Sequence, residues 1–271
     1  MKAPVDLYDS HYDRLDHDVY RSIRAKTFCV DLGQESWITA EECDRFCDWL
    51  EIEAGQRVLE VACGSGGLAT RIAEQRGAAV IGTDINALAI VAARRRAKSR
   101  PAVPQVEFLT ADADGPLPFP DRSFDAVICN DAINHFRDRR RVLQEWRRVL
   151  EVGGRCLFTD PVVLTGLVSN AELAARSSIG YFVFSVPGAN DSQLRETGYG
   201  IERTADVTAG VVETSRRWRA AREEQRAALV GLETEATYEA IQQFLAVVHA
   251  LAAERRLSRI AYVGRRVENA V

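Results

Sequence analysis

One short stretch, residues 58–69, constrains the fold more than any other part of the chain. It begins as an apolar run around one acidic residue, Glu60, and breaks into a turn that contains Gly64, Gly66 and Gly67. A helical pattern follows the turn. Glycine lets a backbone turn tightly and approach a ligand closely, so a strand, a glycine turn and a helix N-terminus together predict a site for a nucleotide-like ligand.

Strand and helix patterns alternate from about residue 57 onward. The expected strands are 57–62, 79–82, 106–110, 124–129, 155–159, 200–208 and 259–266. The expected helices are 67–76, 86–98, 138–150, 191–197, 210–229 and 234–255. This alternation predicts an α/β fold with a Rossmann-like, parallel, doubly wound sheet of about seven strands and a helical cap formed by the late helices.

The chain is long enough for one such domain with appended segments, and it shows no internal repeat and no low-complexity linker. We therefore expect a single domain over 1–271. Within it we expect a helical arm at 1–50, a cofactor-binding core at 51–160 and a substrate cap made by 161–190 and 210–255.

Composition excludes several classes of function. A net charge of −4 gives no reason to expect nucleic acid as a partner, and the basic clusters 94–96 and 139–141 are expected to be solvated helix faces. No apolar run is long enough to cross a membrane, and no signal peptide is expected. The six cysteines show no zinc spacing with the four histidines, so we expect no metal site and buried thiols in a reducing cytoplasm. Only three of the 35 basic residues are lysines, a bias expected of a GC-rich bacterial genome.

Two nucleotide ligands have to be weighed at the glycine turn. Residues 64–69 match the dinucleotide pattern GxGxxA, and Asp84 ends the second strand, where a carboxylate binds the ribose of either NAD or S-adenosylmethionine. Glu60 separates the two, because a carboxylate favours a cationic amino group and sulfonium and repels a pyrophosphate. Asp112 ends the third strand, where it can bind an adenine edge. The Tyr-x-x-x-Lys pair that would support hydride transfer is absent.

Taken in order, three motifs resemble those of the class I S-adenosylmethionine-dependent methyltransferases. They are Val58 to Gly67, Gly82 to Asn86, and Ala111 to Ala113 with the segment 117–135 that follows. The resemblance covers about 50–160 and departs at Ala62, where many members carry glycine. It implies an enzyme with S-adenosyl-L-methionine as cofactor. The cofactor-binding residues that it implies are Glu60, Ala62, Gly64, Gly66, Asp84, Ile85, Asp112, Ala113 and Asn130.

A narrower resemblance is to small-molecule N-methyltransferases of the phosphoethanolamine and sarcosine/dimethylglycine type. It rests on the segments 11–13, 19–23 and 131–135. In the phosphoethanolamine enzymes an N-terminal tyrosine closes over the site and pairs with the histidine of an Asp-Ala-Ile-x-His string. Carried onto this chain, it implies a latch between Tyr12 and His135, a carboxylate on the amine side at Asp131, and a cofactor contact from Tyr20.

The residues themselves leave alternatives open. Methyl transfer from a sulfonium is a direct displacement, so positioning supplies most of the catalysis and a base helps only where the nucleophile begins protonated. His135 titrates near neutrality and Asp131 can attract a cationic amine. Equally, Asp131 can cap a turn, His135 can simply pack beside the cofactor, and Tyr12 can be an ordinary aromatic that packs against a helix. His249 lies in an apolar helical run and is expected to be structural.

Arg176 is the only basic residue in the insert 161–190, which is otherwise rich in apolar residues. A phosphate is best bound by several basic residues, so this insert favours a larger and less charged acceptor. The expected function is methyl transfer from S-adenosylmethionine to a small-molecule acceptor, with an amine nitrogen preferred. Two alternatives remain: a natural-product O- or C-methyltransferase, and a protein that binds S-adenosylmethionine without catalysis. The protein is expected to be cytoplasmic, without a membrane or nucleic-acid partner, and its assembly stays open between a monomer and a homodimer.

Overall fold

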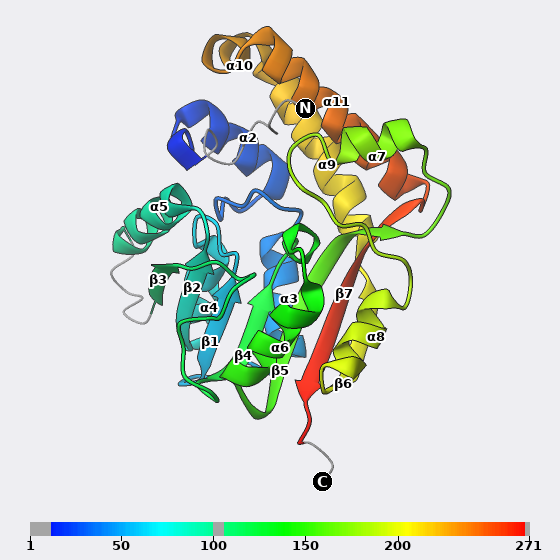
Figure 1. Cartoon of the computed structure of the whole chain (residues 1–271). Coiled ribbons are helices and arrows are strands. Elements are labelled where there is room, and N and C mark those ends of the chain that lie inside the picture. The colour runs from blue at the N-terminus through cyan, green and yellow to red at the C-terminus, as the bar shows by residue number, and fades with distance from the viewer. Residues whose placement is uncertain (1–11, 100–105, 269–271) are drawn as a thin grey trace.

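The computed structural model describes residues 12–99 and 106–268. Within them a seven-stranded sheet is covered by helices on both faces, and further helices form a cap beyond one edge (Figure 1). The strands are β1 (Arg57–Val61), β2 (Ala79–Asp84), β3 (Val106–Thr110), β4 (Phe124–Cys129), β5 (Leu150–Leu164), β6 (Tyr199–Asp206) and β7 (Leu257–Arg266). The helices are α2 (Asp18–Phe28), α3 (Ala40–Trp49), α4 (Gly67–Arg76), α5 (Ala87–Lys98), η1 (Ile133–His135), α6 (Arg139–Val149), α7 (Asn170–Arg176), α8 (Ala189–Glu196), α9 (Thr208–Glu224), α10 (Arg226–Leu232) and α11 (Glu235–Ala253).

The strand order is β3-β2-β1-β4-β5-β7-β6, which confirms the doubly wound α/β sheet with a helical cap. The strands from β3 to β5 run parallel, as predicted. One strand departs from the expected arrangement, because β7 is antiparallel to both β5 and β6. The chain leaves β6 at the upper edge of the sheet, builds α9 to α11 there and re-enters from that same edge, so β7 has to run downward (Figure 1).

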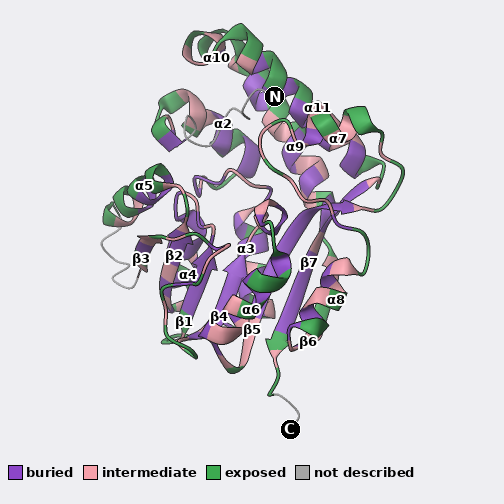
Figure 2. Ribbon diagram, viewed as in Figure 1, coloured by how far each residue is buried: buried purple, intermediate pink, exposed green. Residues whose placement is uncertain are grey.

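The two faces of the sheet carry separate apolar cores. Ile128 of β4 packs with residues of α3 and α4 on one face, and its neighbour Val127 packs with residues of α6 on the other. Successive side chains of a strand point to opposite faces, so a strand covered on both sides is apolar throughout. Figure 2 shows the strands buried and the outward faces of the covering helices exposed.

The N-terminal arm and the cap meet beyond the carboxyl edge of the sheet. Ile23 of α2 packs against Ala221 of α9 and Tyr238 of α11 in one buried cluster. The loop 29–39 then leads from α2 down to α3 and lies against the glycine turn after β1 (Figure 1). None of the helices in the described part of the chain is long and apolar enough to span a membrane.

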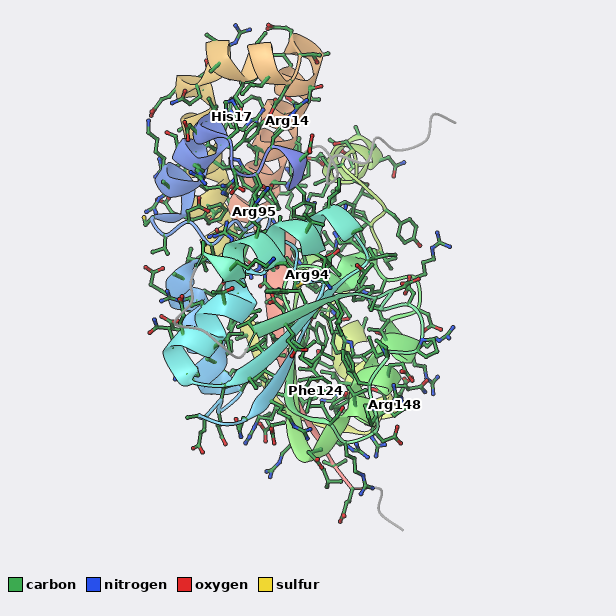
Figure 3. All side chains as sticks on the ribbon, turned by 90° about the vertical axis from the view of Figure 1, so that its left-hand side faces the viewer. Arg14, His17, Arg94, Arg95, Phe124 and Arg148 are labelled. Atoms are coloured by element: carbon green, nitrogen blue, oxygen red, sulfur yellow. The ribbon has the colours of Figure 1, made fainter. Side chains whose placement is uncertain are left out.

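The basic clusters are only partly the solvated faces that we expected. Arg94 and Arg95 are exposed on α5 (Figure 3), yet Arg94 donates to the Phe108 carbonyl at 2.7 Å and Arg95 pairs with Asp16 at 2.5 Å. The expectation is wrong for Arg139, which is 5% exposed and pairs with the buried Asp160 at 2.6 Å. A buried arginine of this kind holds the insert after β5 rather than a solvated surface.

Candidate active site

A cavity of about 600 Å³ lies at the carboxyl edge of the sheet. Its walls come from the glycine turn after β1, the ends of β2 and β4, the arm segment 32–36 and the insert residues 179–181. The strand order reverses between β1 and β4, and ligands of open α/β sheets bind at that switch point. The volume is in the range of small-molecule sites.

The turn needs glycines because neighbouring groups already occupy the space that side chains would fill. A Cβ on Gly64, whose φ is +52°, would lie 2.8 Å from the hydroxyl of Tyr12. A Cβ on Gly67 would lie 1.7 Å from the carbonyl oxygen of Leu32. The arm is therefore seated directly on the turn, and Tyr12 covers Gly64 at the cavity wall.

Ala62 precedes the turn with a φ of +57°. This left-handed conformation costs an L-residue roughly 1–2 kcal/mol and costs glycine almost nothing. The strain gives a physical reason for the glycine that the resemblance leads one to expect at this position. Ala62 nevertheless lines the cavity as predicted.

Two carboxylates form the floor of the cavity beside the turn. Glu60 is 3% exposed, and its Oε2 accepts a hydrogen bond from the Ala69 N–H at 2.8 Å. Burial, assisted by the charge of Asp84, raises the pKa of Glu60 to about 8. Asp84 accepts hydrogen bonds from the N–H groups of Gly64 and Asn86, both at 2.8 Å, and burial raises its pKa too. A floor of this kind stabilises a cationic ligand group and fits the amino group and sulfonium of S-adenosylmethionine.

Most of the predicted site residues line this one cavity. They are Tyr12, Glu60, Ala62, Gly64, Asp84, Ile85, Asn130, Asp131 and His135. Ile85 is 67% exposed at the wall, which offers an apolar surface to a flat ring. His11, the first residue of the segment 11–13 on which the narrower resemblance partly rests, lies outside the described residues.

Four predicted residues do not line the cavity. Gly66 supports the turn from behind, where a Cβ would lie 2.4 Å from the Phe108 ring. Ala113 packs in an apolar core cluster. Asp112 is exposed, and its carboxylate accepts the N–H of Asp114 at 3.0 Å, so its side chain caps a turn.

Tyr20 is also placed away from the cavity lining. Its hydroxyl donates to the Glu233 carboxylate at 2.8 Å, in the cluster where α2 meets the cap. Burial, together with that hydrogen bond, raises the pKa of Tyr20 to about 12. The side chain therefore holds the arm to the cap. The cofactor contact that the narrower resemblance implies for Tyr20 stays a prediction.

His135 stands at the end of η1, directly after β4, with a defined hydrogen-bonding state. Its Nδ1 lies 2.8 Å from the Tyr181 carbonyl oxygen, which can only accept, so Nδ1 carries the proton and Nε2 has the lone pair. The amide nitrogen of Asn134 lies 3.3 Å from Nε2. Burial lowers the pKa of His135 and the charge of Arg176 adds to this, so the ring is uncharged at neutral pH.

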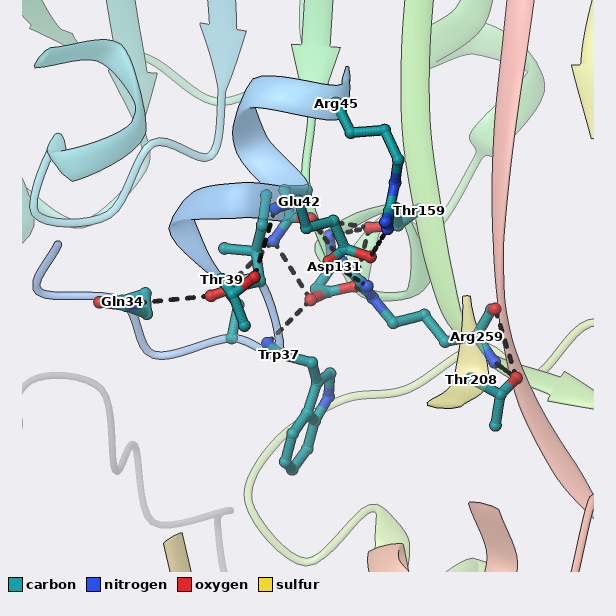
Figure 4. Close-up of polar contacts among 12 residues, drawn as sticks. Gln34, Trp37, Thr39, Glu42, Arg45, Asp131, Thr159, Thr208 and Arg259 are labelled. Atoms are coloured by element: carbon teal, nitrogen blue, oxygen red, sulfur yellow. Dashed lines mark hydrogen bonds and ion pairs between the residues drawn. The ribbon is translucent and has the colours of Figure 1, made fainter. Parts of the chain in front are cut away.

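Asp131 is held in a buried polar network (Figure 4). Its carboxylate accepts from Arg259 Nε at 2.6 Å, from the Thr159 hydroxyl at 2.7 Å and from the Trp37 N–H at 2.9 Å. Arg259 is fully buried and also pairs with Glu42 at 2.6 Å. Burial opposes the charge on Arg259, but the two carboxylates outweigh it and raise its pKa. The charge of Asp131 is thus balanced within the protein, and its carboxylate ties β7 and the arm to the end of β4.

A smaller chamber of about 70 Å³ adjoins the main cavity beneath the cap. The two share the wall residues Glu35, Ser36, Asp131, His135 and Ile179. The remaining walls are mostly aromatic and aliphatic, with one charged residue and one amide among them: Trp37, Asn134, Pro161, Arg176, Phe182, Trp218, Ile241, Phe244 and Leu245. An apolar chamber that opens beside His135 is suited to a second ligand.

In two parts of these walls, sequence reasoning predicted the segment but named no individual residue. The arm segment 32–36 has no motif, and only its contact with the glycine turn brings it to the cavity. The signal for the cap wall was present, because Ile241, Phe244 and Leu245 have the i, i+3, i+4 spacing of one helix face. That spacing does not say what the face covers.

The comparisons with known proteins agree with this geometry. The model of the family described as "Methyltransferase domain" matches residues 59–158. The 27-O-demethylrifamycin SV methyltransferase of Amycolatopsis mediterranei is 34% identical over 175 residues, which cover 63% of each chain. The O-methyltransferase rstn1 of Aspergillus nomiae is 33% identical over 155 residues, 56% of this chain and 68% of that protein. The chain thus spans less than two thirds of the length of the first of these relatives.

Solved structures show the same fold. The phosphoethanolamine N-methyltransferase 2 of Haemonchus contortus, in complex with S-adenosyl-L-methionine, superposes with a TM-score of 0.79 at 21% identity. The superposition covers 95% of this chain and 60% of that one. The glycine turn, the acidic floor, the family match and the relatives together lead to one conclusion: the chain belongs to the class I S-adenosylmethionine-dependent methyltransferases.

Proposed function

We propose that this enzyme methylates a hydroxyl oxygen of a small, largely apolar molecule. The observation that carries the proposal is the state of His135, which is uncharged, has its lone pair on Nε2 and stands where the cofactor cavity and the apolar chamber meet. A hydroxyl begins protonated, and a neutral imidazole is the group that can take its proton at neutral pH.

The residues of the main cavity fit the cofactor. Glu60 would face its cationic amino acid part, Asp84 its ribose and Ile85 its adenine, while the backbone at Gly64 leaves room for close approach. Bound there, S-adenosylmethionine supplies a methyl group on a positively charged sulfur, which departs as a neutral thioether.

At the junction, His135 would act as the base. The acceptor hydroxyl would take the place of the Asn134 amide nitrogen, which lies 3.3 Å from Nε2. Nε2 would then take the hydroxyl proton as the methyl group is transferred, while the Tyr181 carbonyl accepts the Nδ1 N–H. Such a base contributes roughly 10²–10⁴ in rate. The apolar walls around the junction exclude water and so favour a neutral acceptor over a hydrated ion.

An amine nitrogen, preferred on the sequence, is the second candidate acceptor. The carboxylate of Glu35 favours it, because this residue lines both cavities and can attract an ammonium group. The carboxylate first assigned that role, Asp131, is instead paired with Arg259. We propose that Asp131 is a positioning residue. We also propose that a latch between Tyr12 and His135 closes the cofactor cavity rather than the acceptor chamber, because Tyr12 lines only the cofactor cavity.

A paired acceptor screen tests the proposal. Phenols and benzylic alcohols are compared with amines of the same carbon skeleton, and methyl transfer is read by mass spectrometry as the gain of one methylene. The proposal predicts products from the hydroxyl series, with a loss of about 10²-fold or more in kcat for His135→Asn and unchanged affinity for S-adenosylmethionine. Products from the amines alone, or full turnover in His135→Asn, would contradict it.

The setting of the enzyme is a further proposal. The arginine bias favours a bacterial source, and five buried free cysteines among the described residues favour a reducing compartment such as the cytoplasm. A net charge of −4 disfavours nucleic acid as a partner. Sedimentation equilibrium distinguishes a monomer from the homodimer that the sequence left open.

A further inference from the structure

A fully buried carboxylate, Asp160 of β5, lines neither the cofactor cavity nor the small chamber. Its Oδ2 accepts three hydrogen bonds. They come from Arg139 Nη1 at 2.6 Å, from the Ser185 hydroxyl at 2.6 Å and from the Asn190 amide at 2.9 Å. Arg139 begins α6, is also buried and also lines neither space. The Asp160–Arg139 ion pair therefore joins β5 and α6 to two points of the insert that follows β5.

This ion pair is not optimised for stability. Taking two charges out of water is costly, and a buried pair repays that cost only where further hydrogen bonds satisfy both groups. The Nε of Arg139 has no hydrogen-bond partner among the described residues. What the pair does fix is the backbone of the insert, because the second guanidinium nitrogen, Nη2, donates to the Val183 carbonyl at 2.6 Å.

The segment that the ion pair holds, residues 181–185, has little regular structure of its own. It is neither helix nor strand, and its one bridge to β5 pairs Ser185 with Val163. The ion pair binds it at two of its five residues, at the Val183 carbonyl and at the Ser185 hydroxyl. The position of this segment thus depends on a few contacts, of which those with the ion pair carry charge.

The same segment contacts His135 and its helix η1. The Tyr181 carbonyl oxygen lies 2.8 Å from Nδ1 of His135, and the Val183 N–H donates to the Asn134 carbonyl at 2.8 Å. Between them Phe182 packs against the imidazole, with ring centres 4.8 Å apart. Three consecutive residues of the insert therefore meet η1, and the third is the one whose carbonyl the ion pair holds.

The Tyr181 carbonyl imposes a tautomer that an imidazole does not favour by itself. In water the proton of a neutral histidine prefers Nε2, whereas a carbonyl oxygen at Nδ1 can only accept and so keeps the proton on Nδ1. Nε2 accordingly faces a donor, the Asn134 amide nitrogen, at 3.3 Å. A displacement of the carbonyl by roughly 1 Å would break its hydrogen bond and release the tautomer.

We propose that Asp160 and Arg139 are positioning residues of the methyl transfer. Through the segment 181–185 they hold the Tyr181 carbonyl on Nδ1 of His135 and so keep the proton off Nε2, the atom that takes the proton of the acceptor. This catalytic role rests on the proposed function, because it takes His135 as the base. The tautomer itself is a property of the protein and can be measured without an acceptor.

Two variants loosen the insert. Arg139→Gln combined with Asp160→Asn removes both charges, so that neither is left buried and unpaired. Arg139→Lys keeps the charge beside Asp160, but a single ammonium cannot also reach the Val183 carbonyl in the way that a guanidinium does. Because its charges stay paired, Arg139→Lys provides the comparison independently of how stable the double variant is.

Arg148→Gln is the matched control. Arg148 also belongs to α6 and also donates to backbone carbonyls, those of Leu117 and Phe119 at 3.0 and 2.8 Å. These carbonyls belong to the loop before β4 and not to the insert. Arg148→Gln should therefore lower the free energy of unfolding without an effect on His135.

Nitrogen-15 NMR of the imidazole rings at pH 8 measures the tautomer, both in the protein alone and in the protein saturated with S-adenosylhomocysteine. The chain has four histidines, and His135→Asn identifies the signals of His135. Burial lowers the pKa of this ring, so it is neutral at that pH. The wild type and Arg148→Gln are expected to show the Nδ1–H form. The Nε2–H form should predominate in the double variant, and Arg139→Lys should show both forms.

Turnover connects the tautomer to the reaction. With 4-methylphenol as acceptor, kcat of the double variant should fall about tenfold, because fewer rings are in the form that can act as the base. Arg139→Lys should lose less, and Arg148→Gln should keep the kcat of the wild type. Affinity for S-adenosylhomocysteine, measured by calorimetry, should be unchanged in all variants because none of these residues lines the cofactor cavity.

Tautomer and turnover together separate this inference from the proposed function. An Nε2–H form in the wild type, or an Nδ1–H form that survives in both loosened variants, would overturn the inference. Loss of the Nδ1–H form in Arg148→Gln would also overturn it, because the effect would then follow stability and not the insert. A double variant that loses the Nδ1–H form and keeps full kcat would overturn the proposed function, since His135 would not be the base.

Discussion

At the scale of single residues, neighbouring polar side chains have separate tasks. Asp131 and His135 follow the same strand, and the sequence marks both as candidates for chemistry. The structure gives Asp131 a buried cationic partner, Arg259, and leaves His135 uncharged at the junction. The partner of Asp131 lies 128 residues further along the chain, on β7, and no local pattern announces it. Residue type was therefore predictable here, whereas the division of roles was not.

Glu60 makes stability depend on pH. Its pKa of about 8 in the folded protein lies above the ordinary value of 4.5, so the folded state holds the proton more tightly than the unfolded one. The stabilisation is complete below about pH 4.5 and is lost as pH rises through about 8, by at most roughly 1.4 kcal/mol per pH unit. Glu60→Gln should remove this loss, since a neutral amide oxygen can still accept from Ala69.

Urea denaturation of the ligand-free protein at pH 6 and pH 8.5 measures the effect. Between pH 6 and pH 8.5 the free energy of unfolding should fall more for the wild type than for Glu60→Gln. Asp125→Asn is a suitable control, because Asp125 is partly exposed at the opposite end of the sheet, where it accepts the N–H of Arg57. Parallel pH profiles for the wild type and Glu60→Gln would refute the argument.

At the scale of elements, local sequence patterns predicted where helices and strands lie, but not always the residues at which they begin and end. The helix predicted at 67–76 has those bounds in α4. The strand predicted at 155–159 extends over Leu150–Leu164. Pairing with β7 carries its end to Leu164, and pairing of Leu150 with Phe124 of β4 carries its start back beyond two glycines that in isolation indicate a turn. The helix predicted at 210–229 is divided at Gln225 into α9 and α10. Tertiary pairing decides such bounds, and it cannot be read from a window of sequence.

Two glycine substitutions should have opposite effects on stability, because Gly67 lies against the arm loop and Gly210 has free space around it. Gly67→Ala would place a Cβ 1.7 Å from the Leu32 carbonyl oxygen, so the loop 29–39 must move. We expect a loss of roughly 1–3 kcal/mol in the free energy of unfolding and weaker binding of S-adenosylmethionine. Gly210→Ala in α9 meets nothing within 4 Å and should stabilise by roughly 0.5–1 kcal/mol.

Thermal or urea unfolding, together with cofactor titration, measures both variants. A Gly67→Ala protein as stable as the wild type, with unchanged cofactor affinity, would show that the loop adapts without cost. The account of how the arm is seated would then be wrong.

At the scale of the whole molecule, arm, sheet and cap join above the carboxyl edge. The sequence predicted the doubly wound sheet and its cap, because alternating strands and helices leave few other arrangements. The boundaries drawn at 50, 160, 190, 210 and 255 stay predictions. The acceptor walls were less accessible to sequence reasoning, since they combine the arm segment 32–36, the insert after β5 and one face of α11.

Arg259 links these parts from the centre of the molecule. It reaches from β7 to Glu42 of α3 and to Asp131 after β4, with both contacts at 2.6 Å. Arg259→Met should destabilise the fold by roughly 3–5 kcal/mol, because two buried carboxylates lose their counter-charge. Arg259→Lys should retain part of that energy, as a single ammonium cannot satisfy both partners.

The double variant Arg259→Met with Glu42→Gln gives the control by urea unfolding. If the ion pair is responsible, the second substitution should cost much less in this background than in the wild type. Additive losses would show that Arg259 stabilises through packing alone.

The central claim is that the cavity binds S-adenosylmethionine with its cationic part over Glu60 and its ribose at Asp84. Calorimetric titration at pH 7 in phosphate and in Tris, whose ionisation enthalpies differ, tests it most directly. With a pKa of about 8, Glu60 is protonated before binding, and the arriving positive charge should expel about one proton per ligand. We predict this release in the wild type, its loss in Glu60→Gln, and an affinity at least about tenfold weaker in Asp84→Ala. Binding with no proton release in the wild type, and with full affinity in Asp84→Ala, would contradict the account.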